Sequence, residues 1–129
     1  MILLDTCAII WDALAPDKFS DDANRAIKLK EQELMICDIS IWEISMLIKK
    51  KRLVVDNTAS GFINLLLQSR NYLVQDITPE IADLSVNLGS EINQDPADRL
   101  IAATSILNNA PVVTADENLR RATVLETIW

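Results

Sequence analysis

The chain has 129 residues, 50% of them hydrophobic, and its 19 acidic and 12 basic residues give a net charge of -7. This length predicts one domain spanning residues 1–129, and a content of two glycines and four prolines argues against a linker or a low-complexity tail. The acidic balance argues against adhesion to nucleic acid through a broadly basic surface. The absence of histidine excludes imidazole acid–base catalysis, serine–histidine triads and histidine-bound zinc.

The first residues, MILLD, contain no basic leader, and no apolar run approaches the roughly 20 residues needed to cross a bilayer. We therefore expect a cytoplasmic protein without a membrane anchor. Cys7 and Cys37 lie in or beside apolar runs and lack CxxC spacing, so both are expected to be small buried thiols.

Short apolar runs alternate with longer stretches of helical period along the chain. Four or five strands are expected, at residues 2–4, 34–37, 72–74, 112–113 and, more weakly, 124–125. Helices are expected between them, at residues 22–30, 41–51, 58–70, 79–92 and 96–108. N-cap positions are occupied by Ser20, Ser40, Thr78 and Asp95. This alternation predicts a three-layer α/β/α sandwich with a mainly parallel sheet.

Four acidic residues are placed where this topology brings chain segments together. Parallel strands end at one edge of the sheet, where helix N-termini converge and ligands bind. Asp5 and Asp116 follow the expected strands 2–4 and 112–113, whereas Glu43 and Asp98 lie in the first turns of expected helices. The four carboxylates are therefore expected at the same edge.

Three of these acids also have a structural explanation. Ser40 and Glu43 have the spacing of a capping box, in which the glutamate bonds the Ser40 amide. Asp98 would gain stability from a helix dipole, and Asp116 fits the N-cap of a short helix at residues 117–121. Asp5 is harder to explain in this way, because it ends a buried apolar run and no neighbour in sequence offers its charge a partner.

Carboxylates gathered at one edge repel one another, so a hard cation is the partner they lack. Mg²⁺ or Mn²⁺ fits an oxygen-only ligand set, whereas zinc prefers histidine and thiolate ligands. The chemistry expected of such a centre is attack of activated water on a phosphodiester, with the ion stabilising the departing oxygen.

The ordered motifs resemble those of a known family. LLDT at residues 3–6, IWEI at 41–44, DPADRLIAA at 95–103 and VTAD at 113–116 resemble the acidic motifs of PIN domains. The length, order and third motif most resemble the VapC-type ribonuclease toxins of toxin–antitoxin pairs. The resemblance covers nearly the whole chain. Two departures are Ala97, where the family often has a larger apolar residue, and the lack of a histidine before Asp95.

The resemblance implies a PIN-like ribonuclease that depends on Mg²⁺ or Mn²⁺. It assigns the catalytic site to Asp5, Glu43, Asp98 and Asp116. It assigns metal binding to the three aspartates, with Asp5 and Asp98 the principal ligands, and support by hydroxyl hydrogen bonds to Thr6 and Thr114. It also implies an RNA substrate, a homodimer, and an antitoxin partner with a segment across the site.

Basic and aromatic residues are open to two interpretations each. The run Lys49, Lys50, Lys51 and Arg52 suits a helix C-terminus, and it alternatively contacts the RNA backbone. Arg99 follows Asp98 and is expected either to contact a phosphate or to pair with a site carboxylate. Trp11, Trp42, Met46 and Trp129 fit a core, a protein interface or base stacking.

Three other functions compete with RNA hydrolysis. A phosphoryl-accepting receiver domain would have paired acids after the first strand and a lysine after the last, whereas this chain has Asp5 alone and no lysine beyond Lys51. An aspartyl phosphatase would have an acid two residues after Asp5, where Cys7 stands. A scaffolding PIN-like domain is the third alternative, and the four intact acids argue against it.

Overall fold

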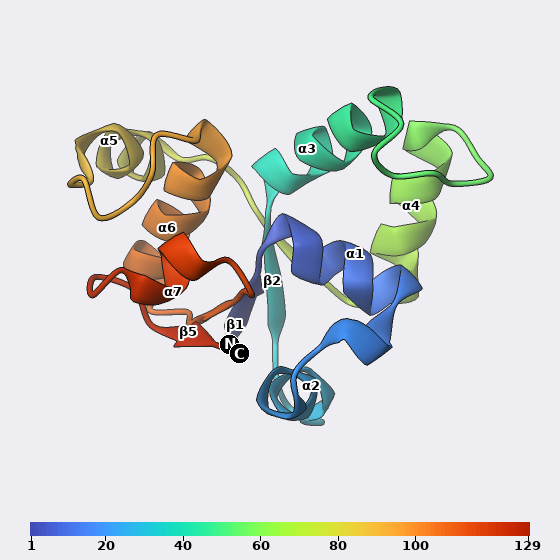
Figure 1. Cartoon of the computed structure of the whole chain (residues 1–129), viewed down its shortest axis with the longest axis horizontal. Helices are drawn as coiled ribbons and strands as arrows, with labels where there is room; N and C mark the ends of the chain where they lie inside the picture. Colours follow the sequence, from blue (N-terminus) through green and yellow to red (C-terminus); the bar gives the residue numbers. More distant parts are fainter.

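A computed structural model describes the whole chain, Met1–Trp129, with a five-stranded sheet between helical layers (Figure 1). The strands are β1 (Ile2–Leu4), β2 (Leu34–Cys37), β3 (Leu73–Gln75), β4 (Val112–Val113) and β5 (Thr127–Ile128). Their order is β3-β2-β1-β4-β5, and all neighbouring pairs are parallel. The predicted three-layer α/β fold is confirmed.

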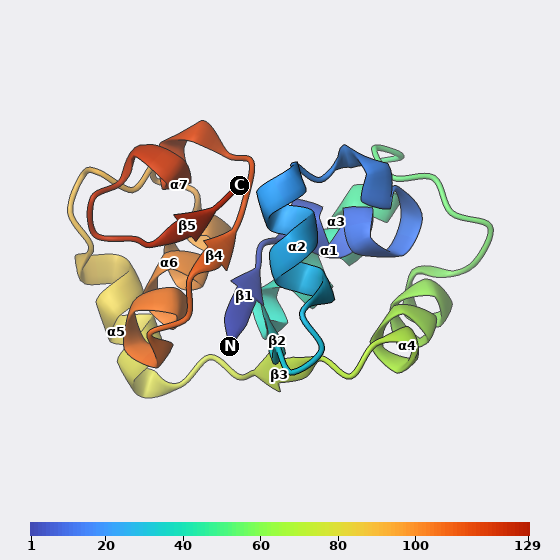
Figure 2. The same cartoon turned by 90° about the horizontal axis from the view of Figure 1, so that it is seen from below.

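The helices are α1 (Thr6–Leu14), α2 (Asp21–Lys28), α3 (Asp38–Lys49), α4 (Ala59–Ser69), α5 (Pro79–Asn87), α6 (Pro96–Asn108) and α7 (Glu117–Arg121), with a 3-10 turn at Pro16–Lys18. Figures 1 and 2 show α1–α4 on one side of β1 and β2, and α5 and α6 on the other. No helix has the length and apolar character needed to cross a membrane.

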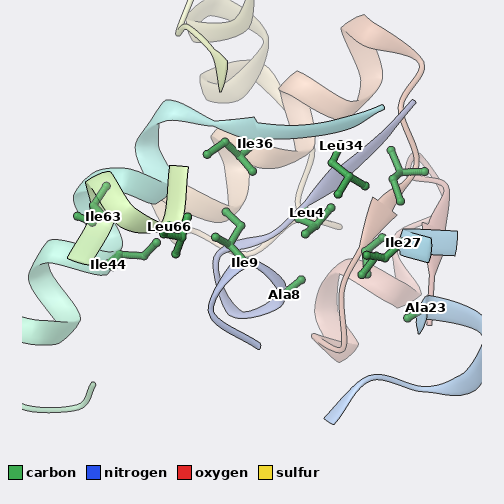
Figure 3. Close-up of a cluster of buried hydrophobic side chains, with 12 residues drawn as sticks. Leu4, Ala8, Ile9, Ala23, Ile27, Leu34, Ile36, Ile44, Ile63 and Leu66 are labelled. Carbon is green, nitrogen blue, oxygen red and sulfur yellow. The ribbon is translucent and has the colours of Figure 1, made fainter. Parts of the chain in front are cut away.

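Alternate residues of the strands supply the two sides of the core. Ile2 and Leu4 of β1 join side chains of α1–α4 in a cluster of 12 buried residues, most of which Figure 3 labels. Leu3 points to the opposite face, where it packs with Ile101 of α6. A parallel strand covered on both faces must be apolar at every position, which explains the uninterrupted runs in β1 and β2.

Polar caps fix several helix starts as predicted. Ser20, Thr78 and Asp95 each accept a hydrogen bond from the backbone N–H three residues later. Asp116 caps α7 in the same way. These caps set where α6 and α7 begin, and therefore where their acidic first turns lie.

Other boundaries differ from prediction. α1 was not predicted, because it begins immediately after β1 with no intervening loop. Helix α5 ends at Asn87 instead of residue 92, and the last strand lies at Thr127–Ile128 instead of residues 124–125. Val124 is 50% exposed, so its apolar character does not mark a buried strand.

The prediction that Ser40 is an N-cap is wrong. α3 begins at Asp38, with Cys37 as its N-cap, so Ser40 lies inside the helix and is fully buried. Glu43 consequently lies in the second turn of α3 instead of the first.

Candidate functional site

A cleft of about 300 Å³ lies at the carboxyl ends of the central strands. The strand order reverses beside β1, which has β2 on one side and β4 on the other, and ligands of parallel sheets bind at such a switch point. The cleft is lined by Asp5, Thr6, Cys7, Trp11, Glu43, Asp98, Ile101, Ala115 and Asp116. All four predicted carboxylates therefore lie in one cleft.

Asp5 joins the end of β1 to the start of α1. One carboxylate oxygen accepts the Ala8 backbone N–H at 2.8 Å, and the other accepts the Thr114 hydroxyl. The expectation that Asp5 lacks a nearby partner is therefore wrong, because it caps a helix that the sequence did not reveal. Burial raises the pKa of Asp5 from 3.8 to about 6, against the lowering effect of these two hydrogen bonds. The charges of Asp98 and Asp116 raise it further.

Glu43 is oriented by α1. The Thr6 hydroxyl donates to Glu43 Oε1 and also lies 2.9 Å from the Ser40 hydroxyl. The capping-box interpretation is wrong, because Ser40 is not an N-cap and Glu43 bonds a residue 37 positions away in sequence. Burial raises the pKa of Glu43, and nearby carboxylates including Asp98 add to the rise.

Asp98 and Asp116 complete the acidic cleft from two helix N-termini. Asp98 Oδ2 accepts a hydrogen bond from Asn93 Nδ2 at 2.9 Å, and its pKa is raised by burial and by neighbouring carboxylates. Asp116 Oδ1 accepts the backbone N–H of Leu119 at 3.0 Å. The Thr114 hydroxyl accepts the Asp116 N–H at 3.0 Å while it donates to Asp5, so one threonine links two of the acids.

The donor set suits a hard cation. Glu43 Oε2, Asp98 Oδ1 and Asp116 Oδ2 accept no hydrogen bond from the protein, and none of them is a buried atom without a partner. These oxygens are therefore free to accept bonds from water or a metal ion. As the side chains stand, no group of three acidic or thiol side chains is arranged to hold a metal ion. Oxygen ligands without histidine match Mg²⁺ or Mn²⁺ in kind.

Arg99 does not have either predicted contact. It is 9% exposed, and its guanidinium donates to the backbone carbonyls of Ser85, Leu88, Ile92 and Asn93. It therefore holds the segment between α5 and α6 instead of binding a phosphate or a carboxylate. Adjacency to Asp98 was misleading, because consecutive helix residues point in different directions.

The remaining candidate residues differ in whether they line the acidic cleft. Lys49, Lys50, Lys51 and Arg52 are exposed at the far end of α3 and do not line the cleft. Cys7 is exposed at the cleft instead of buried as expected. Desolvation in the cleft raises the pKa of its thiol to about 11, with the Asp5 charge as the next cause, so the thiol stays protonated.

Two residues that the sequence analysis did not assign to the site support the acids: Asn93, which it did not name, and Ser40, which it named only as a helix cap. Asn93 bonds Asp98 through its amide and accepts the Asp95 N–H through its carbonyl oxygen at 2.8 Å. An asparagine two residues before a helix cap is a local turn signal that would have identified it. Ser40 contacts Thr6, and only the tertiary fold reveals that link.

Comparisons of the sequence with known proteins indicate one family, and comparisons of the structure indicate the same fold. The family model for the PIN domain matches residues 2–125. Ribonuclease VapC22 of Mycobacterium tuberculosis (strain ATCC 25618 / H37Rv) is 33% identical over 119 residues, which cover 92% of this chain and 89% of that protein. Similar solved structures include VapBC2 from Rickettsia felis bound to a promoter DNA fragment, with a TM-score of 0.70, 21% identity and coverage of 98% and 97%. A toxin–antitoxin complex from Klebsiella pneumoniae has a TM-score of 0.66, also at 21% identity and with coverage of 98% and 97%.

Proposed function

The chain belongs to the PIN-domain family and resembles its VapC members, and from this premise we propose that it is a metal-dependent ribonuclease. The proposed reaction is hydrolysis of RNA phosphodiesters in the acidic cleft. The similarity to a protein named as a ribonuclease supports the activity, and the oxygen-only donor set supports Mg²⁺ or Mn²⁺ as the cofactor.

One observation carries this proposal: four carboxylates from four different elements line a single cleft at the switch point of the sheet. Grouping them is costly in the metal-free protein, because burial and mutual repulsion raise the pKa values of Asp5, Glu43 and Asp98. Such a cost is expected at a functional site, where a ligand supplies the missing positive charge. A purely structural role does not explain it.

Bound in this cleft, a divalent ion would activate water and stabilise negative charge on the phosphodiester oxygens. Asp5, Asp98 and Asp116 are the proposed ligands. The bonds from Ala8 and Thr114 fix the Asp5 carboxylate, and the Asn93 amide fixes one oxygen of Asp98. These bonds limit the motion of the acids and so prepare the site for binding.

Glu43 has a different proposed role. The Thr6 hydroxyl holds Oε1, which leaves Oε2 to accept a proton from the attacking water. A cleft carboxylate with one oxygen held and the other unbonded suits the role of a general base. Glu43 therefore acts as the general base while the aspartates hold the ion.

We further propose that the chain works with a protein antitoxin and as a homodimer. One of the two similar structures is named as a toxin–antitoxin complex and the other as VapBC2, which supports the antitoxin. The homodimer rests on the family resemblance. Light scattering of the chain alone and with a candidate antitoxin tests both parts, and a monomer at all concentrations contradicts the dimer.

The activity is tested by incubating purified protein with total RNA in Mg²⁺, in Mn²⁺ and in chelator, followed by mapping of the cleaved ends. We expect cleavage only with metal and none with Asp98→Asn under the same conditions. Because water and not the ribose 2′-hydroxyl is the nucleophile, the products should lack 2′,3′-cyclic phosphate. If the purified wild-type protein cuts no RNA with either metal, the proposed activity is contradicted and the scaffolding alternative is favoured.

A further inference from the structure

An apolar groove lies beside the acidic cleft. Ile39, Trp42 and Met46 follow one another at helical spacing along α3 and form one wall. Pro96 and Ala97, in the first turn of α6, form the other. The groove has a volume of about 480 Å³, within the range of pockets that hold small organic groups.

Trp42 is the open aromatic surface of this groove. Its side chain is 58% exposed. Trp11 and Trp129, by contrast, pack on each other with ring centroids 5.6 Å apart, and Phe19 contacts both rings. The sequence left the roles of the tryptophans open. In the structure Trp11 and Trp129 form an aromatic cluster, whereas Trp42 remains available to a ligand.

The groove is continuous with the proposed site. Glu43 lines both the groove and the cleft. Asp95, at the opposite rim, is close enough to Glu43 and Asp98 for its charge to raise both of their pKa values. The groove that contains Trp42 is therefore the immediate neighbour of a phosphate bound at the carboxylates.

The charge and the apolar lining of the groove favour the base of a nucleotide over its phosphate. Its only charged lining residues are Glu43 and Asp95, which repel a phosphate. An unpaired base is neutral and flat, stacks on an indole, and carries edge N–H groups that donate to carboxylates. Ala97 adds little bulk to the wall that α6 contributes.

We propose that this groove binds an unpaired nucleobase of single-stranded RNA, stacked on Trp42 next to the phosphodiester that is cut. This inference rests on the proposed ribonuclease function. Trp42 thereby acts as a residue that determines specificity, because it favours substrates whose adjacent base is free to leave a duplex.

The first test compares cleavage of single-stranded RNA by Trp42→Leu, which keeps an apolar side chain, and Trp42→Phe, which keeps a ring. Loss of stacking should lower kcat/KM about 5- to 150-fold in Trp42→Leu, whereas Trp42→Phe should retain most of the activity. Leu65→Ala is the matched control, since Leu65 is 59% exposed on α4, away from the groove. It should cleave like the wild type. Melting temperatures of all variants verify folding.

The second test removes the base instead of the ring. An RNA that is abasic at the stacked nucleotide should be cut slowly by the wild type and no more slowly by Trp42→Leu, because the two losses are one interaction. Independent, multiplied losses would overturn the proposal. Equal activity of Trp42→Leu and wild type on intact RNA would also overturn it, as expected if the groove takes an apolar side chain of a protein.

A binding measurement separates this inference from the proposed hydrolysis. In an Asp98→Asn background, a short single-stranded RNA should quench the fluorescence of Trp42. This quenching should be missing from Asp98→Asn/Trp42→Leu. Quenching of Trp42 without cleavage by the wild type would support the base site and contradict the proposed nuclease activity. Cleavage by the wild type with no Trp42-dependent quenching would overturn the base site alone.

Discussion

Replacing Asp5 by asparagine removes one negative charge from the most buried acid of the cleft. Asp5 is 8% exposed, and its pKa rises from 3.8 to about 6 in the folded protein. At 1.36 kcal/mol per pKa unit, this rise corresponds to about 3 kcal/mol of lost stability at neutral pH in the absence of metal. An amide oxygen still accepts the Ala8 N–H, but the bond from Thr114 is weakened, so the net gain in Asp5→Asn is about 1–3 kcal/mol.

The sign of the pH dependence follows from the direction of the shift. Because folding raises the pKa of Asp5, its contribution to stability is full below about pH 4 and is lost as the pH rises through about 6. The free energy of unfolding of Asp5→Asn should therefore equal that of the wild type or lie up to about 2 kcal/mol below it near pH 4, where only the weakened Thr114 bond counts, and exceed it near pH 7. Urea unfolding of both proteins in chelator, from pH 4 to pH 8, measures this difference. A difference that does not change with pH, or a wild type that is more stable at pH 7, would refute the reasoning.

Three further substitutions separate chemistry from structure. Glu43→Gln should lower RNA turnover about 10²- to 10⁴-fold at a nearly unchanged melting temperature, and turnover equal to the wild type would remove Glu43 from the site. Arg99→Met frees several backbone carbonyls and should cost about 2–4 kcal/mol in urea unfolding, whereas unchanged stability with lost cleavage would restore a catalytic role. Asp12, whose side chain is 4% exposed, accepts hydrogen bonds from Arg70 and Tyr72. Asp12→Asn should therefore lower the free energy of unfolding by about 1–3 kcal/mol. An unchanged midpoint in the same urea experiment would contradict this.

The parts of the fold that were predictable from sequence are those where one local rule acts alone. β1, β2 and β4 are continuous apolar runs because both of their faces are covered. α6 was bounded correctly because Asp95 caps it and Pro96 occupies its first position. The edge of the sheet that carries the acids follows from these elements.

The errors arise where one residue serves two elements. Asp5 ends β1 and caps α1, so the absence of a loop concealed the helix and made the acid seem to lack a partner. Ser40 and Glu43 match a capping box in spacing, yet the partner that orients both is Thr6 of α1. Such contacts depend on the packing of α1 against α3, which no local pattern specifies.

The parts of the site that were not predictable depend on side-chain direction. Arg99 neighbours Asp98 in sequence but lies on the buried side of α6, where four carbonyls surround it. Trp42 neighbours Glu43 but remains exposed. Sequence reasoning located the helices that carry these residues and did not determine which side of each helix faces the cleft.

We propose above that the acids of the cleft hold a catalytic divalent ion. This proposal is tested most directly by titrating Mn²⁺ into the wild type and Asp116→Asn, with bound metal measured by electron paramagnetic resonance and RNA cleavage measured on the same preparations. We predict that binding and cleavage rise together in the wild type and that both shift to higher Mn²⁺ concentration in Asp116→Asn. Cleavage that persists in chelator, or that is unchanged in Asp116→Asn while metal binding is lost, would contradict the claim.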